Sequence, residues 1–247
     1  MSQCRMRRGI GFSAAICLLL IVGADRAWSA ERYLIGPATL QASPSVSQNL
    51  VDAVNPQGWV LYTQSYGIKE QICEIFLAKM VATQSASHAS GKMPYSSLKE
   101  GALVGVIHLL PEATEDYSVD FHNQELKPGY YTMRYAVMPA GTYENGTKPG
   151  EFVVLSPANM DRDPSHILKA EELARFGAFT SGTDVAASME LVAPETSTRE
   201  FPTVKVDETG MCIFQVRLRL AATKASSSRE LALAIAMFTP LHGPEGS

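Results

Sequence analysis

Cysteine, long apolar runs and excess positive charge are all scarce in this sequence. Four of its 247 residues are cysteines, which is too few for the disulfide-dense class of small secreted domains. After residue 30, no apolar stretch has the roughly 20 residues that a transmembrane helix needs. The formal net charge is −4, and an acidic chain with scattered Lys and Arg is a poor match for nucleic acid. We therefore expect no nucleic-acid partner, and no transmembrane span beyond the N-terminal segment.

The first 29 residues have the pattern of a secretory signal peptide. Arginines at positions 5, 7 and 8 precede an apolar core at 10–24, and small residues stand before a cleavage site after Ser29 or Ala30. The core is short for a bilayer span, which favours cleavage over an uncleaved anchor. Cleavage removes four basic residues and one acidic residue, so the remaining chain has a formal net charge of about −7. We expect a periplasmic or secreted bacterial protein with a Sec-type signal.

Residues 30–247 are predicted to form a single domain, because no linker-like stretch of low complexity divides them. The clearest strand is 130–137, where β-favouring residues alternate with a period of two after the Pro128-Gly129 turn. A second apolar run at 151–155 predicts a hairpin with a long connecting loop. The other stretches predicted as strands are 58–64, 71–81, 102–110, 117–121, 189–192, 211–221 and 230–238.

About nine short strands predict an all-β fold, mainly an antiparallel β-sandwich, with one or two short helices and preceded by an N-terminal signal helix. Alternation along 130–137 indicates a half-buried strand. A helix is expected at 166–176, with Asp163 as its N-cap and Pro164 at its first position. One or two helical turns are expected within 46–54.

The loop at 139–150 is a candidate contact site for a ligand or a partner. Tyr143, Glu144, Asn145 and Lys148 stand on a Gly/Pro-rich frame between the two hairpin strands. A rigid sheet can present such side chains to a binding partner. A surface insertion that carries no function explains the same loop equally simply.

Two cysteines remain after cleavage, Cys73 and Cys212, and both stand in apolar strand patterns. In an oxidising compartment an isolated pair of cysteines can form a disulfide. Two buried reduced thiols are the alternative, because free cysteine is among the most buried residue types. Both states remain open at this point.

Asn159, Asp161 and Asp163 begin like a calcium-binding loop, since oxygen-bearing side chains alternate. Pro164 stands where such a loop needs glycine, and Ala170 replaces the bidentate glutamate. Turn formation and helix capping explain the same residues. We therefore expect no metal and no cofactor. The histidines are dispersed without metal-ligand spacing, at His88, His108, His122, His166 and His242.

No catalytic motif stands out. The sequence has no G-x-S-x-G nucleophile elbow and no glycine-rich phosphate loop. Thiols in apolar runs have a raised pKa and react slowly. We therefore assign no catalytic residues and expect a binding role rather than an enzyme.

The segments PGYYTMRYAVMP, FVVLSP and SGTDVAASMELVAP, with an aspartate (Asp161 or Asp163) and a short helix between the last two, resemble a family of uncharacterised exported bacterial proteins. The segments YGIKEQICEIFLAK and LKEGALVGVIHLLPEATEDY follow the same pattern, so the resemblance covers most of 58–240. It implies a secreted β-rich fold without an established activity. The family pattern has a histidine in the long loop and a His-Pro after Gly-Thr. Here the loop reads GTYENGTKPG, and Asp184-Val185 follows Gly182-Thr183.

Three functions are compatible with these observations. The first is an exported, non-enzymatic interaction module or accessory subunit with a protein partner in the cell envelope. The second is a small-ligand or carbohydrate-binding protein that uses Trp59 and the tyrosines of the hairpin, and burial of Trp59, Tyr131 and Tyr135 in the core would remove it. The third is a metal-dependent hydrolase whose site forms only in three dimensions. Its candidate residues are His122, His166, Glu151, Asp161 and Asp163.

Overall fold

The structure is a computed structural model that describes residues 32–65, 68–84, 93–111, 120–122, 124–138, 150–195, 200–208, 210–222 and 229–237. The predicted signal peptide at 1–29, with its signal helix, lies outside these residues. So do most of the strand expected at 117–121 and the two histidines His88 and His242. The described residues belong to the unit Glu31–Ser247. No helix in this described part is long and apolar enough to cross a membrane.

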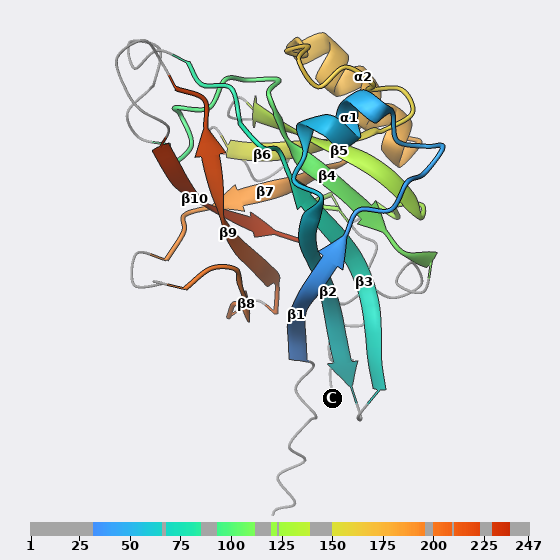
Figure 1. Cartoon of the computed structure of the whole chain (residues 1–247), viewed down its shortest axis with the longest axis vertical. Helices are drawn as coiled ribbons and strands as arrows, with labels where there is room; N and C mark the ends of the chain where they lie inside the picture. Colours follow the sequence, from blue (N-terminus) through green and yellow to red (C-terminus); the bar gives the residue numbers. More distant parts are fainter. Residues whose placement is uncertain are drawn as a thin grey trace, which may run out of the picture. The chain divides into compact units, whose positions relative to one another are not determined.

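Ten strands and two helices make up the described fold (Figure 1). The strands are β1 (Arg32–Thr39), β2 (Gln57–Ser65), β3 (Ile68–Leu77), β4 (Leu103–Leu109), β5 (Gly129–Met138), β6 (Gly150–Pro157), β7 (Ser188–Val192), β8 (Thr203–Val206), β9 (Cys212–Leu220) and β10 (Arg229–Ala236). The helices are α1 (Gln48–Ala53) and α2 (Ala170–Ser181). All neighbouring strands pair antiparallel, in the order β1-β2-β3-β4-β5-β6-β7-β10-β9-β8.

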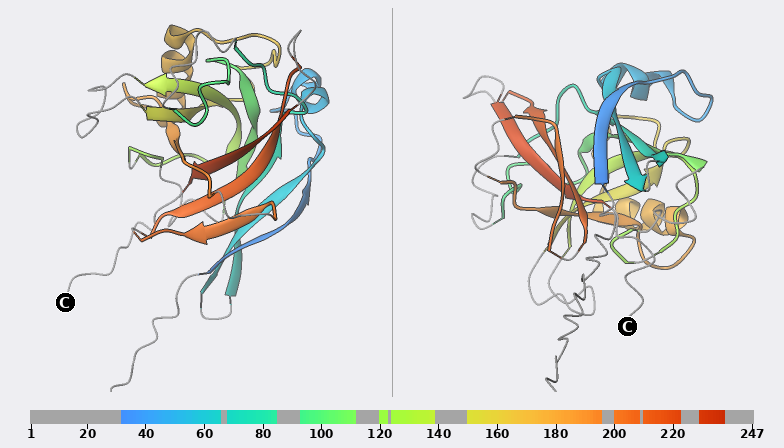
Figure 2. Two further views of the ribbon diagram at one scale, coloured as in Figure 1. Left: turned by 90° about the vertical axis from the view of Figure 1, so that its left-hand side faces the viewer. Right: turned by 90° about the horizontal axis from the view of Figure 1, so that it is seen from below.

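The strands form one curled sheet, and β7 is its corner. The first part of β7 pairs with β6, whereas Leu191 and Val192 pair with β10. The two outermost strands of the order, β1 and β8, contact each other, so the sheet nearly closes (Figure 2). The predicted antiparallel β fold with two helices is confirmed. The sandwich of two stacked sheets is replaced by this barrel-like arrangement, because a strand that pairs on both edges joins the two halves.

The central hairpin has the predicted position, but it is more deeply buried than the alternating pattern indicated. β5 and β6 pair from Tyr131 opposite Pro157 to Met138 opposite Gly150. Thr132, Arg134 and Ala136 are buried, although they lie on the face opposite the main core. The segment after β6 and helix α2 cover that face (Figure 1). A period-two pattern shows that a strand has one more polar face, but it does not show whether that face contacts solvent or a second layer of the protein.

Helix α2 begins later than expected. Its N-cap is Lys169, whose backbone N–H donates to the Glu172 carboxylate at 2.9 Å. The predicted N-cap, Asp163, instead accepts hydrogen bonds from the amide and hydroxyl of Ser165, which form a turn outside the helix. The helix ends at Gly182, whose φ of +70° is the left-handed conformation that favours glycine.

A buried ion pair fixes the segment after β6 against β5. Arg134 is fully buried and donates from Nε and Nη2 to the two carboxylate oxygens of Asp161, both at 2.7 Å. Its remaining N–H groups reach three carbonyl oxygens, those of Gly101, His166 and Asp163. Thr132 adds a hydroxyl donor to Asp161 at 2.5 Å. All five guanidinium donors are therefore satisfied, as a buried charge requires.

Replacing Arg134 with alanine is expected to lower the free energy of unfolding by about 3–5 kcal/mol, because the Asp161 carboxylate is then buried without a partner. The matched control is Arg217→Ala. Arg217 pairs with Glu230 on the exposed surface, where such a pair contributes about 0–1 kcal/mol. Urea denaturation of both variants measures the two losses. Equal losses at the two positions would contradict the structural role of the buried pair.

Candidate functional site

The four residues proposed at the hairpin tip, Tyr143, Glu144, Asn145 and Lys148, lie outside the described residues. The contact role proposed for them therefore stays a prediction. The described residues next to that loop, Met138 and Gly150, are the last residue of β5 and the first of β6.

The calcium-like residues do not converge on one point. Asp161 is held by Arg134 and Thr132, and Asp163 caps the turn at Ser165. The carbonyl of Asn159 accepts a hydrogen bond from Arg162. Within the described ranges, no group of three His, Cys, Asp or Glu side chains could hold a metal ion. Turn formation accounts for Asp163 and the buried ion pair with Arg134 accounts for Asp161, whereas the expected helix capping by Asp163 is wrong because Lys169 is the N-cap.

Most residues of the hydrolase hypothesis are dispersed, although His166 and Asp163 are neighbours, with the His166 amide donating to the carbonyl of Asp163 at 3.3 Å. The His166 ring lies 3.3 Å from the Glu172 carboxylate on the surface, and His122 lines a separate cavity beside α2. Glu151 is buried and accepts hydrogen bonds from the Tyr135 hydroxyl at 2.7 Å and from the Tyr95 amide at 3.0 Å. Tyr95 in turn donates from its hydroxyl to the carbonyl of Val192, and it accepts from the amide of Ala234. This network joins β6, β7 and β10 rather than forming a cleft.

The aromatic residues proposed for sugar binding are mostly in the core. Tyr135 is fully buried and Tyr131 is 6% exposed. The Tyr131 hydroxyl donates to the carbonyl of Lys127 at 2.7 Å. Trp59 is partly buried and packs against the ring of Phe214. A flat platform made of Trp59, Tyr131 and Tyr135 is therefore excluded.

Cys73 and Cys212 are not joined by a disulfide in this structure, and both are fully buried. Burial raises the pKa of the Cys73 thiol well above its ordinary value, and the nearby Cys212 raises it further. A thiol of this kind is a poor nucleophile at neutral pH. Because Cys212 influences the pKa of Cys73, the two thiols lie near each other, one on β9 and the other on β3. The disulfide stays a prediction.

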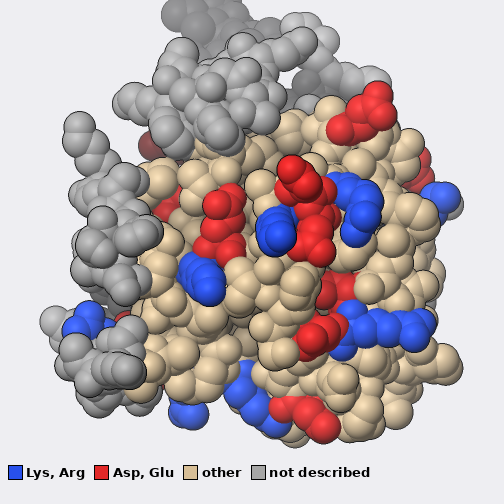
Figure 3. All heavy atoms as spheres, turned by 90° about the horizontal axis from the view of Figure 1, so that it is seen from above, with Lys and Arg blue, Asp and Glu red and all other residues tan. Residues whose placement is uncertain are grey.

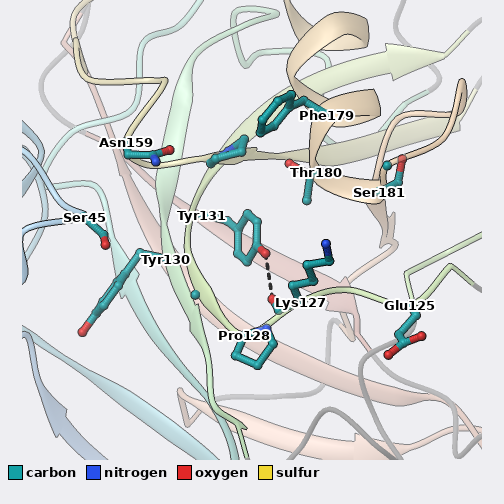
Figure 4. Close-up of a pocket in the computed structure, with 13 residues that line it drawn as sticks. Ser45, Glu125, Lys127, Pro128, Tyr130, Tyr131, Asn159, Phe179, Thr180 and Ser181 are labelled. Carbon is teal, nitrogen blue, oxygen red and sulfur yellow. Dashed lines mark hydrogen bonds between the residues drawn. The ribbon is translucent and has the colours of Figure 1, made fainter.

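A pocket of about 430 Å³ lies between the C-terminal end of α2 and the start of β5 (Figure 4). We call it the α2 pocket. Its lining comes from four separate parts of the chain: Ser45, Glu125, Lys127, Pro128, Gly129, Tyr130, Tyr131, Pro157, Asn159, Phe179, Thr180, Ser181 and Gly182. In Figure 4, Asn159, Ser45 and Tyr130 lie on one side, and Thr180, Ser181 and Lys127 lie on the other. The pocket thus presents amide, hydroxyl, ammonium and aromatic groups together.

The walls of the α2 pocket are fixed by hydrogen bonds. The Arg134–Asp161 pair holds the segment that carries Asn159. The Ser47 hydroxyl at the start of α1 donates to the carbonyl of Arg162, which ties the chain near Ser45 to the same segment. The Thr180 hydroxyl donates to the carbonyl of Leu155, which fixes the end of α2 on β6. The backbone segments that line the pocket are therefore held in place by contacts that do not depend on a ligand.

Tyr130 is oriented by a stacked partner. Its ring is parallel to the His108 imidazole, with centroids 3.8 Å apart. His108 is held in turn by the Glu74 carboxylate, 2.9 Å from Nδ1. These three residues are direct neighbours on β3, β4 and β5. Sequence reasoning missed this row because its members lie 34 and 22 positions apart along the chain, and only the strand register brings them together.

Alkylation with iodoacetamide, mapped by mass spectrometry, tests the state of the cysteines. In the folded protein we expect neither Cys73 nor Cys212 to react, because both are buried and the pKa of Cys73 is raised. In denaturant without reductant, reduced thiols react with iodoacetamide, whereas a disulfide does not. Reaction only after reduction would establish the disulfide. Reaction of Cys73 in the folded protein would contradict its burial.

The buried carboxyl of Glu151 is expected to make stability depend on pH. Burial raises its pKa above the ordinary value of 4.5, although the hydrogen bonds from Tyr135 and Tyr95 act in the opposite direction. The folded protein then binds this proton more tightly than the unfolded chain, so ionisation destabilises the fold as the pH rises above 4.5.

Urea denaturation between pH 4 and pH 7 measures this effect. The stability of the wild type relative to Glu151→Gln should fall as the pH rises. In the Tyr135→Phe background, where one hydrogen bond to the carboxylate is lost, the fall should be larger. If the stability of the wild type relative to Glu151→Gln stays constant or increases as the pH rises, the pKa of Glu151 is not raised in the folded protein.

No protein-family model, no curated protein and no solved structure matches the chain. The α2 pocket is therefore the candidate functional site on the strength of its own geometry.

Proposed function

We propose that the protein is an exported, non-enzymatic binding protein of the cell envelope, and that the α2 pocket holds a sugar unit of its ligand. The main support for this proposal is that the pocket is lined by both hydrogen-bonding and aromatic side chains. Its volume of about 430 Å³ lies in the range of ligand pockets, roughly 300–1,000 Å³. Export rests on the signal pattern of residues 1–29.

The chemistry of the lining favours a hydroxyl-rich molecule. Asn159, Lys127 and Glu125 offer an amide, an ammonium and a carboxylate, which between them both donate and accept hydrogen bonds. The rings of Tyr130 and Phe179 offer apolar surface to the C–H face of a sugar. Because His108 already holds the Tyr130 ring, less side-chain freedom is lost on binding.

The use of buried charge supports binding rather than catalysis. In the described part of the chain, Arg134, Asp161 and Glu151 each have structural hydrogen-bond partners. A catalytic acid or base has to reach a substrate. These groups instead connect strands and loops to one another.

A protein contact is a second candidate, and it is favoured by apolar exposure beside the pocket. Phe179 is 65% exposed, and Met160, next to Asn159, is 40% exposed. On the uncovered part of the face in Figure 3, basic and acidic side chains are interspersed. A partner docked there would rely on apolar contacts rather than on a large patch of one charge. In this case the protein is an interaction module or accessory subunit.

Isothermal titration calorimetry of the full chain with maltose, cellobiose and N,N′-diacetylchitobiose tests the sugar proposal. We expect at least one of the three to bind. Phe179→Ala should weaken that binding about fivefold, which corresponds to ~1 kcal/mol for a lost ring contact. Asn159→Ala should weaken it by a similar factor, the effect of one lost hydrogen bond.

The matched control is Ile68→Ala. Ile68 is as exposed as Phe179, at 64%, but it lies at the start of β3 and does not line the pocket. Binding that Phe179→Ala and Ile68→Ala weaken equally would argue against the α2 pocket. Absence of binding for all three sugars would remove the sugar proposal and leave the protein contact.

A further inference from the structure

Another cavity lies at the opening of the curled sheet, between strands near the two ends of its order. β8 pairs only with the first part of β9, from Cys212 to Gln215. Beyond that point the chain after β3 approaches β9, where the Val81 amide donates to the carbonyl of Arg219 at 2.9 Å. A cavity of about 290 Å³ remains between β9 and the start of β2. We call it the seam cavity; its lining includes Asn55, Gln57, Trp59, Ala78, Arg217 and Arg219.

The two arginines of the seam cavity differ in their pairing. They stand two residues apart on β9, both exposed and on the same face of the strand. Glu230 is the direct cross-strand neighbour of Arg219, but its carboxylate bonds diagonally to Arg217 at 3.0 Å. Arg217 also lies over the Phe201 ring, 4.9 Å from its centroid. Among the described residues, the Arg219 guanidinium has no ion pair or hydrogen bond.

The seam cavity is therefore a cationic site with an apolar wall in an acidic protein. Two arginines and one glutamate leave one net positive charge beside the cavity. Trp59 contributes an aromatic ring that packs against the ring of Phe214, with centroids 6.0 Å apart. The side-chain amides of Asn55 and Gln57 add hydrogen-bonding groups to the lining.

We propose that the seam cavity binds a small aromatic carboxylate. A guanidinium matches a carboxylate with two parallel hydrogen bonds, and the unpaired Arg219 supplies it. The ring of the ligand packs on Trp59. The aromatic wall formed by Trp59 favours an anion that carries a ring over inorganic phosphate. A volume of about 290 Å³, at the lower limit of ligand pockets, accommodates one ring rather than a nucleotide.

Tryptophan fluorescence provides a local test. The chain has two tryptophans, Trp28 and Trp59, so Trp28→Phe leaves Trp59 as the single reporter in the full chain. Titration with benzoate should change this fluorescence in a saturable manner. Arg219→Gln should weaken benzoate binding at least tenfold, as expected for the loss of a charge-assisted pair of hydrogen bonds. Glu230→Gln should strengthen it, because a competing carboxylate is removed.

Neutral benzamide and an exposed arginine elsewhere complete the experiment. Benzamide has the shape of benzoate without its charge, and it should not saturate the site. Arg175→Gln on the exposed face of α2 should leave benzoate binding unchanged. The proposal is overturned if benzoate produces no saturable change, if benzamide binds equally well, or if Arg219→Gln and Arg175→Gln have the same effect. Inorganic phosphate that binds more tightly than benzoate would also overturn it.

Discussion

The buried pair between Arg134 and Asp161 is the interaction on which the described structure depends most. A guanidinium with no exposure is tolerated only because all five of its donors find acceptors. Those acceptors belong to the turn before β4 and to the segment between β6 and α2, whereas Arg134 itself stands on β5. One residue therefore fixes the layer that covers the outer face of the hairpin, and the α2 pocket lies at the edge of that layer.

Local patterns in the sequence predicted the positions of β5 and β6 well, but they did not predict which residues of these strands are buried or how the strands are ordered in the sheet. The alternation from Tyr130 to Val137 and the apolar run after it identified β5 and β6 within one or two residues. The same alternation gave no sign that Arg134 would be buried, because its partners lie 27 to 33 positions away. The sandwich expectation failed for a related reason. Whether β7 pairs on one edge or on both is decided by strand order, which local periodicity does not encode.

The two candidate sites could not be predicted from the sequence either, because their residues are distant along the chain. Tyr130, His108 and Glu74 form a row only in the register of three strands. Among the described residues, Arg219 has no ion-pair partner, because its cross-strand neighbour Glu230 bonds diagonally to Arg217. Asp161 and Tyr135, which the sequence suggested as site residues, instead form buried hydrogen bonds with Arg134 and Glu151. Arg134, Asp161 and Glu151 stabilise the fold, and the residues that we propose for ligand binding line the α2 pocket and the seam cavity.

A crystal structure of the protein soaked with the sugar that binds most tightly tests whether the α2 pocket is the binding site. We expect electron density in the α2 pocket, with the sugar packed against Phe179 and Tyr130 and hydrogen-bonded to Asn159 or Lys127. We also expect the backbone around Arg134 and Asp161 to remain in place on binding. Density at any other surface, or a pocket that forms only after this ion pair separates, would contradict this assignment.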